Sequence, residues 1–354
     1  DQMHIKCWPR ARVRKILYLL GMDFKKTYQN EQRFSTITSI YPEEFDVLFR
    51  AFEPRWLQAH KHYNFRGKRR SKPLTSKQLL APTKTLPTNR EKLFFILYLY
   101  KINPLQDVAG ATFDMDQGQV SRWKKVLTPI LLQALKDLDL HAARNTEELI
   151  RLFRTRQRKK DKDENIDSMH IDVTERPIQR NKDKGAQRND YSRKQAGHTI
   201  KNTIICDEYQ FIHFAGFTWR GAIHDKAMVD EEVTSFGHPV FADLWLSKDA
   251  GYQGYLPSGI NILEPFKPFR DNPITEFQKE FNRWVSSIRT VVEDAIGGVK
   301  RLRSAFERVR KFLTYRADQT LQVAVGLHNL RVSLRDSYST KSSCVRANLV
   351  ILDT

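Results

Sequence analysis

The chain has 354 residues, which is long for a single ordinary core, and its hydrophobic content of 40% excludes wholesale disorder. Lys and Arg outnumber Asp and Glu by 60 to 41, and the net charge of +19 indicates a polyanionic partner, nucleic acid ahead of an anionic membrane. Three scattered cysteines argue against a disulfide framework or a structural zinc site and favour a reducing compartment, and the longest apolar run, 93–100, is about half of a membrane span.

Residues 1–88 are predicted to be mostly helical and to end in a linker, without an assigned role. Amphipathic helices are expected at 13–20 and 45–52, the second entered through Pro42, a residue suited to a first helical turn. The segment 61–87 is basic and punctuated by proline, and includes Arg66, Lys68, Arg69, Arg70 and Lys72. It is either a solvated connector or an exposed segment that contacts DNA.

Residues 89–165 carry a pattern typical of a helix-turn-helix DNA-binding domain followed by a connector. A core helix is expected over 92–100, a second over 105–111, and a third after Asp116 as its N-cap. The predicted buried positions are Val108, Ala109, Met115, Val120 and Trp123. The outward side chains, of types that read base edges and phosphates, form the predicted recognition helix: Gln117, Gln119, Ser121, Arg122 and Lys125. An ordinary helical hairpin is the alternative, because the turn has Phe113-Asp114 where a glycine is often found.

Residues 166–335 show the element order of an RNase H-like catalytic domain, and 336–354 a tail. Met169, Ile171 and Val173 alternate with polar residues, which predicts a strand with one apolar face. Further strands are expected at 198–206, 210–219 and 240–246, and helices at 228–236, 276–313 and 320–334. The expected fold class is α/β (α+β): a mixed sheet flanked by helices, preceded by the all-α helix-turn-helix region.

Three acids fall at related places in these elements. Asp172 lies on the polar face of the first strand, Asp249 follows the fourth strand before a glycine-rich turn, and Glu293 lies on the long helix. If the two strands are neighbours and the helix crosses them, the carboxylates converge. Such hard oxygen ligands suit Mg²⁺ or Mn²⁺, and two ions about 3.5–4 Å apart serve phosphodiester displacement. Taken singly, the acids have plainer interpretations as a strand residue, a turn former and a surface ion pair.

Arg289, Glu293 and Lys300 share one edge of the long helix, because they are four and then seven residues apart. On this segment alone the pattern indicates a solvated pair between Arg289 and Glu293. Together with the two aspartates it indicates a metal-binding carboxylate flanked by cations that hold phosphates. Gly297 and Gly298 are unfavourable inside a helix, which suggests that a strand or DNA backbone approaches closely there.

The chain resembles the DDE transposases of bacterial insertion sequences, in the branch related to Harbinger nucleases, over roughly residues 90–335. The matching segments are 92–123, 170–177, 198–201, 221–226, 249–254 and 289–301, and the most specific patterns are Asp249-x-Gly251-Tyr252-x-Gly254 and Arg289-x3-Glu293-x6-Lys300. The resemblance implies that Asp172, Asp249 and Glu293 are the catalytic and metal-holding triad. It also implies phosphate contacts for Arg289 and Lys300. Ser286 stands where related families often have a tyrosine, so the chain departs from the family pattern at this position.

The predicted function is therefore that of a DNA transposase, which cuts element ends to a 3′-OH and joins that hydroxyl in line to target DNA. The cofactor would be Mg²⁺ or Mn²⁺, two ions per active site. The partners would be double-stranded DNA, as terminal inverted repeats and as target, and a second copy of the chain or more, without a membrane. The location would be the cytoplasm, on the nucleoid, in a bacterium and the nucleus in a eukaryote.

Basic residues of the excursion 179–196 and of the following strand are expected to contact DNA phosphates: Arg193, Lys194 and Lys201. His224 and Asp225 are expected to form a structural turn. Two alternatives share most of these features: a domesticated DNA-binding protein that has lost the chemistry, and an RNase H-like endonuclease without transposition activity.

Overall fold

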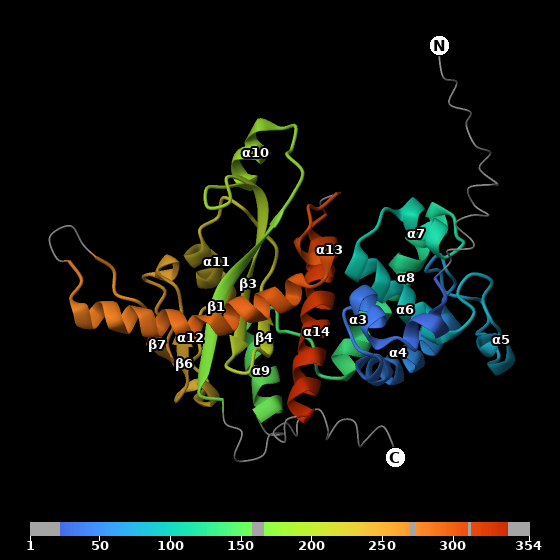
Figure 1. The fold of residues 1–354 in the computed structure, drawn as a ribbon, viewed down its shortest axis with the longest axis horizontal. Helices are drawn as coiled ribbons and strands as arrows, with labels where there is room; N and C mark the ends of the chain where they lie inside the picture. The colour runs from blue at the N-terminus through green and yellow to red at the C-terminus, as the bar shows by residue number, and fades with distance from the viewer. Residues whose placement is uncertain (1–21, 158–165, 269–272, 311–312, 339–354) are drawn as a thin grey trace, which may run out of the picture. The chain divides into compact units, whose positions relative to one another are not determined.

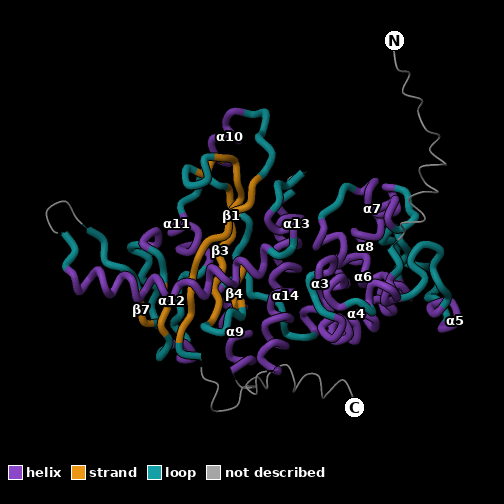
Figure 2. The backbone as a smooth tube through the Cα atoms, in the orientation of Figure 1, coloured by secondary structure: helices purple, strands orange, loops and turns teal. Residues whose placement is uncertain are grey.

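The computed structural model describes residues 22–157, 166–268, 273–310 and 313–338. The helix predicted at 13–20 and most of the predicted tail lie outside these described residues. The contacts divide the chain into two compact units, residues up to Ala134 and residues from Leu135, and Figure 2 shows the secondary structure of both. The division falls within helix α8 (Gln117–Asp137) and so coincides with neither predicted boundary, at 88 or at 165.

The first unit is built from helices. They are α2 (Phe24–Tyr28), α3 (Glu31–Thr38), α4 (Pro42–His62), α5 (Ser76–Leu80), α6 (Asn89–Ile102), α7 (Gln106–Thr112) and the first part of α8. As predicted, α4 has Pro42 in its first turn, but it continues to His62. The rings of Phe34 in α3 and Phe94 in α6 stack with centroids 5.7 Å apart. Residues before 88 therefore share a core with the predicted DNA-binding helices.

The burial of α7 and α8 follows the prediction with one exception. Four of the expected core residues are buried: Ala109, Met115, Val120 and Trp123. Val108 is 52% exposed, because in the short helix α7 the buried face is formed by Ala109 and Gly110 instead. Gln117, Ser121, Arg122 and Lys125 are exposed, as expected.

The turn between α7 and α8 forms without a glycine at its centre. Asp114 takes the left-handed conformation, with φ 52°, which aspartate tolerates better than most residues. The glycine of this turn lies earlier, at Gly110, where a Cβ would be 2.5 Å from the carbonyl oxygen of Met115. At the start of α8 the Asp116 Oδ1 accepts a hydrogen bond from the Gln119 N–H at 2.7 Å, and the Gln119 side chain accepts one from the Asp116 N–H at 2.9 Å. Gln119 is thus engaged in capping its own helix.

The second unit contains a mixed sheet with the order β2-β3-β1-β6-β7, and β4 and β5 also pair with β3. The strands are β1 (Ser168–Pro177), β2 (Tyr191–Ser192), β3 (Gly197–Asp207), β4 (Ile212–Ala215), β5 (Trp219–Arg220), β6 (Trp245–Ser247) and β7 (Asn261–Leu263). The first two predicted strands correspond to β1 and β3, which pair antiparallel. The predicted third strand is split into β4 and β5. The fourth begins later than predicted, because Pro239–Phe241 form a 3-10 turn.

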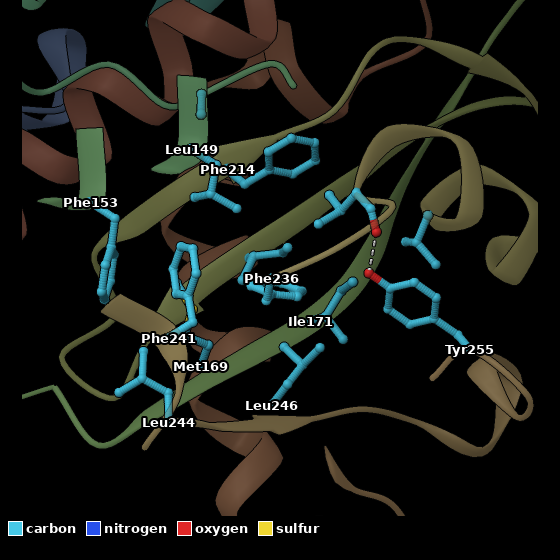
Figure 3. Close-up of a cluster of buried hydrophobic side chains, with 14 of the residues drawn as sticks. Leu149, Phe153, Met169, Ile171, Phe214, Phe236, Phe241, Leu244, Leu246 and Tyr255 are labelled. Atoms are coloured by element: carbon cyan, nitrogen blue, oxygen red, sulfur yellow. Dashed lines mark hydrogen bonds between the residues drawn. The ribbon is translucent and has the colours of Figure 1, made fainter. Parts of the chain in front are cut away.

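Helices cover both faces of this sheet. They are α9 (Thr146–Gln157), α10 (Lys184–Asp190), α11 (Asp225–Glu232), α12 (Glu276–Lys300), α13 (Arg303–Phe306) and α14 (Thr314–Tyr338). On one face, Met169 and Ile171 of β1 pack with Leu149 and Phe153 of α9 in a hydrophobic core (Figure 3). Helix α12 packs across β1 and β3 (Figure 1). This arrangement fits the DDE nuclease fold, and the finer RNase H-like assignment stays a prediction.

Helix α12 is packed tightly against α14 near its end. A Cβ added at Gly298 would lie 2.1 Å from Nδ1 of His328, a buried side chain of α14. The Arg331 Nη2 donates a hydrogen bond to the Gly298 carbonyl oxygen at 2.6 Å. The close approach suggested for this position therefore involves a helix. At Gly297 a Cβ would have nothing within 4 Å. Every helix among the described residues is too short or too polar to cross a membrane.

Substituting the two glycines should have opposite effects on stability. Gly298→Ala should destabilise the fold by about 1–3 kcal/mol, because the His328 ring is held by a 2.8 Å hydrogen bond with the Gln210 carbonyl and has little room to move. Gly297→Ala should stabilise it by about 0.5–1 kcal/mol, because alanine restricts the unfolded chain. Urea unfolding of both variants measures the difference. Equal effects at the two positions would contradict this account of the packing.

Candidate active site

Asp172 and Asp249 are brought together by the register of two parallel strands. In the β1–β6 pair, Met169 lies beside Leu246 and His170 beside Ser247. Continuing the same register by two residues brings Asp172 of β1 next to Asp249, which directly follows β6. Since side chains alternate along strands, both lie on the face opposite the core that contains Met169 and Ile171. The predicted convergence of the first two acids thus follows from strand pairing.

Arg289 of α12 lies between these two carboxylates. Its Nη2 is 3.9 Å from Asp172 Oδ2 and 3.8 Å from Asp249 Oδ2, and only 13% of its side chain is exposed. The two carboxylate oxygens are therefore no farther apart than the sum of these distances. Among the described residues, the ion pairs of Arg289 are with these two aspartates and not with Glu293. The predicted solvated pair between Arg289 and Glu293 is thus not formed, and Arg289 instead lies between Asp172 of β1 and Asp249, which follows β6.

The two acids differ in their surroundings. Burial raises the pKa of Asp172, and the hydrogen bond from the Val173 N–H to its Oδ1, at 2.7 Å, together with the charges of Arg289 and Lys194, acts in the opposite direction. The Asp172 side chain is 18% exposed and the Asp249 side chain 41%. The site therefore has one acid that is partly desolvated and one that is open to solvent.

Glu293 and Lys300 lie farther along α12. Glu293 is exposed and lies one turn beyond Arg289, while Lys300, the last residue of the helix, is half-buried. Within the described ranges, no group of three His, Cys, Asp or Glu side chains is arranged to hold a metal ion. The structure thus brings two of the three predicted triad members together, and the role of Glu293 stays a proposal.

Two buried hydrogen-bond donors near the acids have no protein partner among the described residues. They are the Tyr252 hydroxyl, which follows Asp249 in a 3-10 turn (Ala250–Tyr252), and the Nε of Arg289. Burial raises the pKa of Tyr252, and the charges of Asp172 and Asp249 raise it further. Buried donors are normally satisfied, so these two are exceptions in the packing around the acids, and Tyr252 is itself part of the hydrophobic core of this unit. The sequence pattern contained Tyr252, but its burial was not evident from spacing.

A hydrogen bond from His170 links strands β1 and β6 close to the two acids. The His170 Nδ1 hydrogen-bonds the Ser247 Oγ at 2.7 Å across β1 and β6, two residues before each aspartate. Burial lowers the pKa of His170 to about 4, so the ring is neutral near pH 7. The alternation along β1 puts His170 on the same face as Asp172, but a hydrogen bond to a strand remote in sequence could not be predicted from it.

Lys201 is placed differently from the other predicted phosphate contacts. Its Nζ donates to Asp225 Oδ1 at 2.8 Å and to the Ile223 carbonyl at 3.0 Å, and it is 3.7 Å from Glu175. The side chain is 8% exposed. Because its charge is balanced by two neighbouring carboxylates, this placement gives little support to direct phosphate binding. His224 caps α11, in keeping with the structural turn expected for His224-Asp225.

A basic groove of about 1070 Å³ lies beside the acids. We use this name for the groove whose cationic lining residues are Arg180, Lys184, Arg188, Arg193, Lys194 and Lys201. It also reaches Gly251, two residues beyond Asp249. Arg193 and Lys194, both predicted to contact phosphates, are exposed here. The groove therefore continues from the basic excursion to the neighbourhood of the acid pair.

Comparisons with known proteins agree with the resemblance seen in the sequence. Residues 171–329, which include all three predicted acids, match the family described as DDE superfamily endonuclease. A protein of Microchaete diplosiphon, named "Probable transposase for insertion sequence element IS702", is 30% identical over 123 residues, 35% of this chain and 42% of the relative. The match thus spans less than half of that relative's length. No solved structure gives a significant match. The resemblance to DDE transposases of insertion sequences is confirmed.

Removing the charge of Asp172 should stabilise the fold near neutral pH. A raised pKa means that the folded protein favours the protonated form of Asp172. The stability gained from this protonated form is fully present below the ordinary pKa of 3.8 and is lost as the pH rises through the folded-state pKa. We expect Asp172→Asn to unfold at higher denaturant than the wild type at neutral pH, by on the order of 1 kcal/mol, with the gap closing in acid. Asp243→Asn, at an exposed acid, is the matched control. A less stable Asp172→Asn variant would mean that the attraction of Arg289 outweighs burial.

Proposed function

We propose that the chain is a DNA transposase whose second unit cuts and joins DNA strands. The observation that carries the proposal is the meeting of Asp172 and Asp249 around Arg289, inside the segment that matches the DDE endonuclease family. Paired carboxylates next to a cation are suited to phosphodiester chemistry, because they can hold metal ions close to a bound phosphate. The relative named as an insertion-sequence transposase supports transposition ahead of other DNA cleavage.

Asp172 and Asp249 would hold Mg²⁺ or Mn²⁺, and Glu293 would join them from the next turn of α12. The fit rests on two hard carboxylate ligands that already face one shared positive charge. Two such ions, when bound, activate the attacking oxygen and stabilise the leaving one. Arg289 and Lys300 would contact phosphate oxygens from the same helix.

The proposed reaction has two in-line steps. In the first, a water oxygen attacks the phosphorus at the element end, and the bond from phosphorus to the 3′ oxygen breaks, which frees a 3′-OH. In the second, this hydroxyl attacks a phosphodiester of the target, and the target's own 3′ oxygen leaves. A covalent protein intermediate is not needed. Joining two element ends to one target requires a dimer or larger assembly on double-stranded DNA, on the nucleoid of a bacterium or in a eukaryotic nucleus.

The DNA would be held by both units. In the second unit, Arg193 and Lys194 of the basic groove would contact the phosphate backbone beside the acids. In the first unit, α7 and α8 would act as a helix-turn-helix that recognises the terminal repeats. The exposed residues at the start of α8 are the proposed contacts: Gln117, Ser121, Arg122 and Lys125, with Gln119 limited by its capping role.

Neutralising the proposed ligands should abolish cleavage without loss of the fold. Asp249→Asn and Glu293→Gln should each lower Mg²⁺-dependent cleavage of a duplex that carries the flanking inverted repeats by about a thousandfold or more, because a metal ligand is lost. Gel analysis of the nicked strands measures this. The controls are Asp243→Asn and Asp294→Asn, exposed acids close to each target in the chain.

The outcomes separate the proposed assignments. Full cleavage by Asp249→Asn would contradict the site itself, and full cleavage by Glu293→Gln would remove only the third ligand. Cleavage by the wild type without any strand transfer would favour the endonuclease alternative. Repeat-specific binding without any metal-dependent nicking would favour the domesticated DNA-binding protein.

Lys125 should contribute to recognition of the element ends through a phosphate contact. Lys125→Ala is expected to weaken binding to the terminal repeat and to reduce the slope of log affinity against log salt by about one. Fluorescence anisotropy at several salt concentrations measures both quantities. Lys136→Ala removes the same charge from an exposed position near the other end of α8 and should leave the salt slope almost unchanged. Equal effects of the two substitutions would contradict the proposed docking of the α8 start.

A further inference from the structure

The basic groove contains an exposed aromatic side chain among its cations. Tyr191 of β2 is 43% exposed and lines the groove together with Arg193 and Lys194. Its cross-strand partner is His198 of β3, and the two rings make an edge contact with centroids 5.8 Å apart and planes at 76°. His198 therefore supports the tyrosine ring from one side. A plain electrostatic surface for a DNA backbone does not require such a ring.

The backbone next to Tyr191 is held by hydrogen bonds and close packing. The neighbouring Asp190 is buried, and its Oδ1 accepts a hydrogen bond from Arg220 Nη1 at 2.5 Å. The Ala222 N–H donates to the Asn189 carbonyl at 3.0 Å. A Cβ at Gly221 would lie 2.4 Å from Thr199 Oγ1 and 2.5 Å from the Asp190 carbonyl, so only glycine allows this approach. The backbone beneath Tyr191 is therefore preformed, so it needs little ordering when a ligand binds.

The charges of the groove select an anion that has several phosphates. Arg180, Lys184, Arg188, Arg193 and Lys194 are exposed and line it, while Lys201 is balanced by Asp225. A cationic groove combined with an aromatic platform is the combination that binds single-stranded nucleic acid, because the phosphates meet the cations and a free base stacks on the ring. In a duplex the bases are stacked on one another, so a side chain at the backbone meets no base face.

We propose that the basic groove binds an unpaired DNA strand, with one base stacked on Tyr191 and the strand leading toward Asp172 and Asp249. Gly251 lines the end of the groove that is nearest to Asp249 in the chain. A Cβ at Gly251 would have nothing within 4 Å, so the space beside it is open. The proposal rests on the proposed function and deepens it: the strand presented for cutting or joining is separated from its complement at this point. It predicts a preference for DNA ends that have a single-stranded extension.

The test compares labelled duplexes with blunt ends, duplexes with a short single-stranded overhang, and oligothymidylate, by fluorescence anisotropy with full-length protein in EDTA. We expect the overhang to bind more tightly than the blunt end. Tyr191→Ala should lower affinity for the overhang and for oligothymidylate by about tenfold to a hundredfold and leave blunt duplex binding unchanged. Tyr191→Phe should keep the wild-type affinities, since the ring is retained. Tyr209→Ala, at an exposed tyrosine outside the groove lining, is the control.

Two results would overturn the proposal: no preference of the wild type for unpaired ends, or an equal loss of blunt and overhang binding in Tyr191→Ala. The binding assay requires no cleavage. A failure of the proposed transposase function would appear as missing Mg²⁺-dependent cutting, while the strand preference would still be measurable by itself.

Discussion

Two carboxylates held side by side in a partly buried place repel each other and lose solvation, and a cation between them offsets part of this cost. In this protein the parallel pairing of β1 with β6 brings Asp172 next to Asp249, and the Arg289 guanidinium lies within 4 Å of both. The His170–Ser247 hydrogen bond fastens the strands, and the packing of Gly298 on α14 positions the helix. Both features help to hold Arg289 beside Asp172 and Asp249.

Much of the framework could be predicted from local patterns. The period-two alternation identified β1, and α12 begins after Thr275, which forms a capping box with Gln278. The acids were identified because their order along the chain matched the order of elements. Spacing on α12 favoured a pair between Arg289 and Glu293, but the partners of Arg289 come from strands remote in sequence. Local spacing contains no information about such partners, so this part of the site could not be predicted.

Other differences also arise from tertiary context. The strands β6 and β7 have three residues each, and they form because β1 and β6 supply hydrogen-bonding edges, not because of their own propensity. Lys201 looked like a free cation in the sequence, yet Asp225 and Glu175 neutralise it. Residues before 88 were predicted to be helical but had no assigned role, and ring contacts of Phe24 and Phe34 with Phe94 show that they complete the core of the first unit.

Helix α12 carries Arg289, Glu293 and Lys300 on one unbroken rod of 25 residues, about 37 Å long. Its contact with His328 and Arg331 at Gly298 holds its last turn, and Val285, Val292, Ala295, Ile296 and Val299 are buried along its length. At the other end, Phe277 and Trp284 are exposed. Because the three polar side chains share one helix, their spacing is set by the helical repeat and not by the conformations of separate loops.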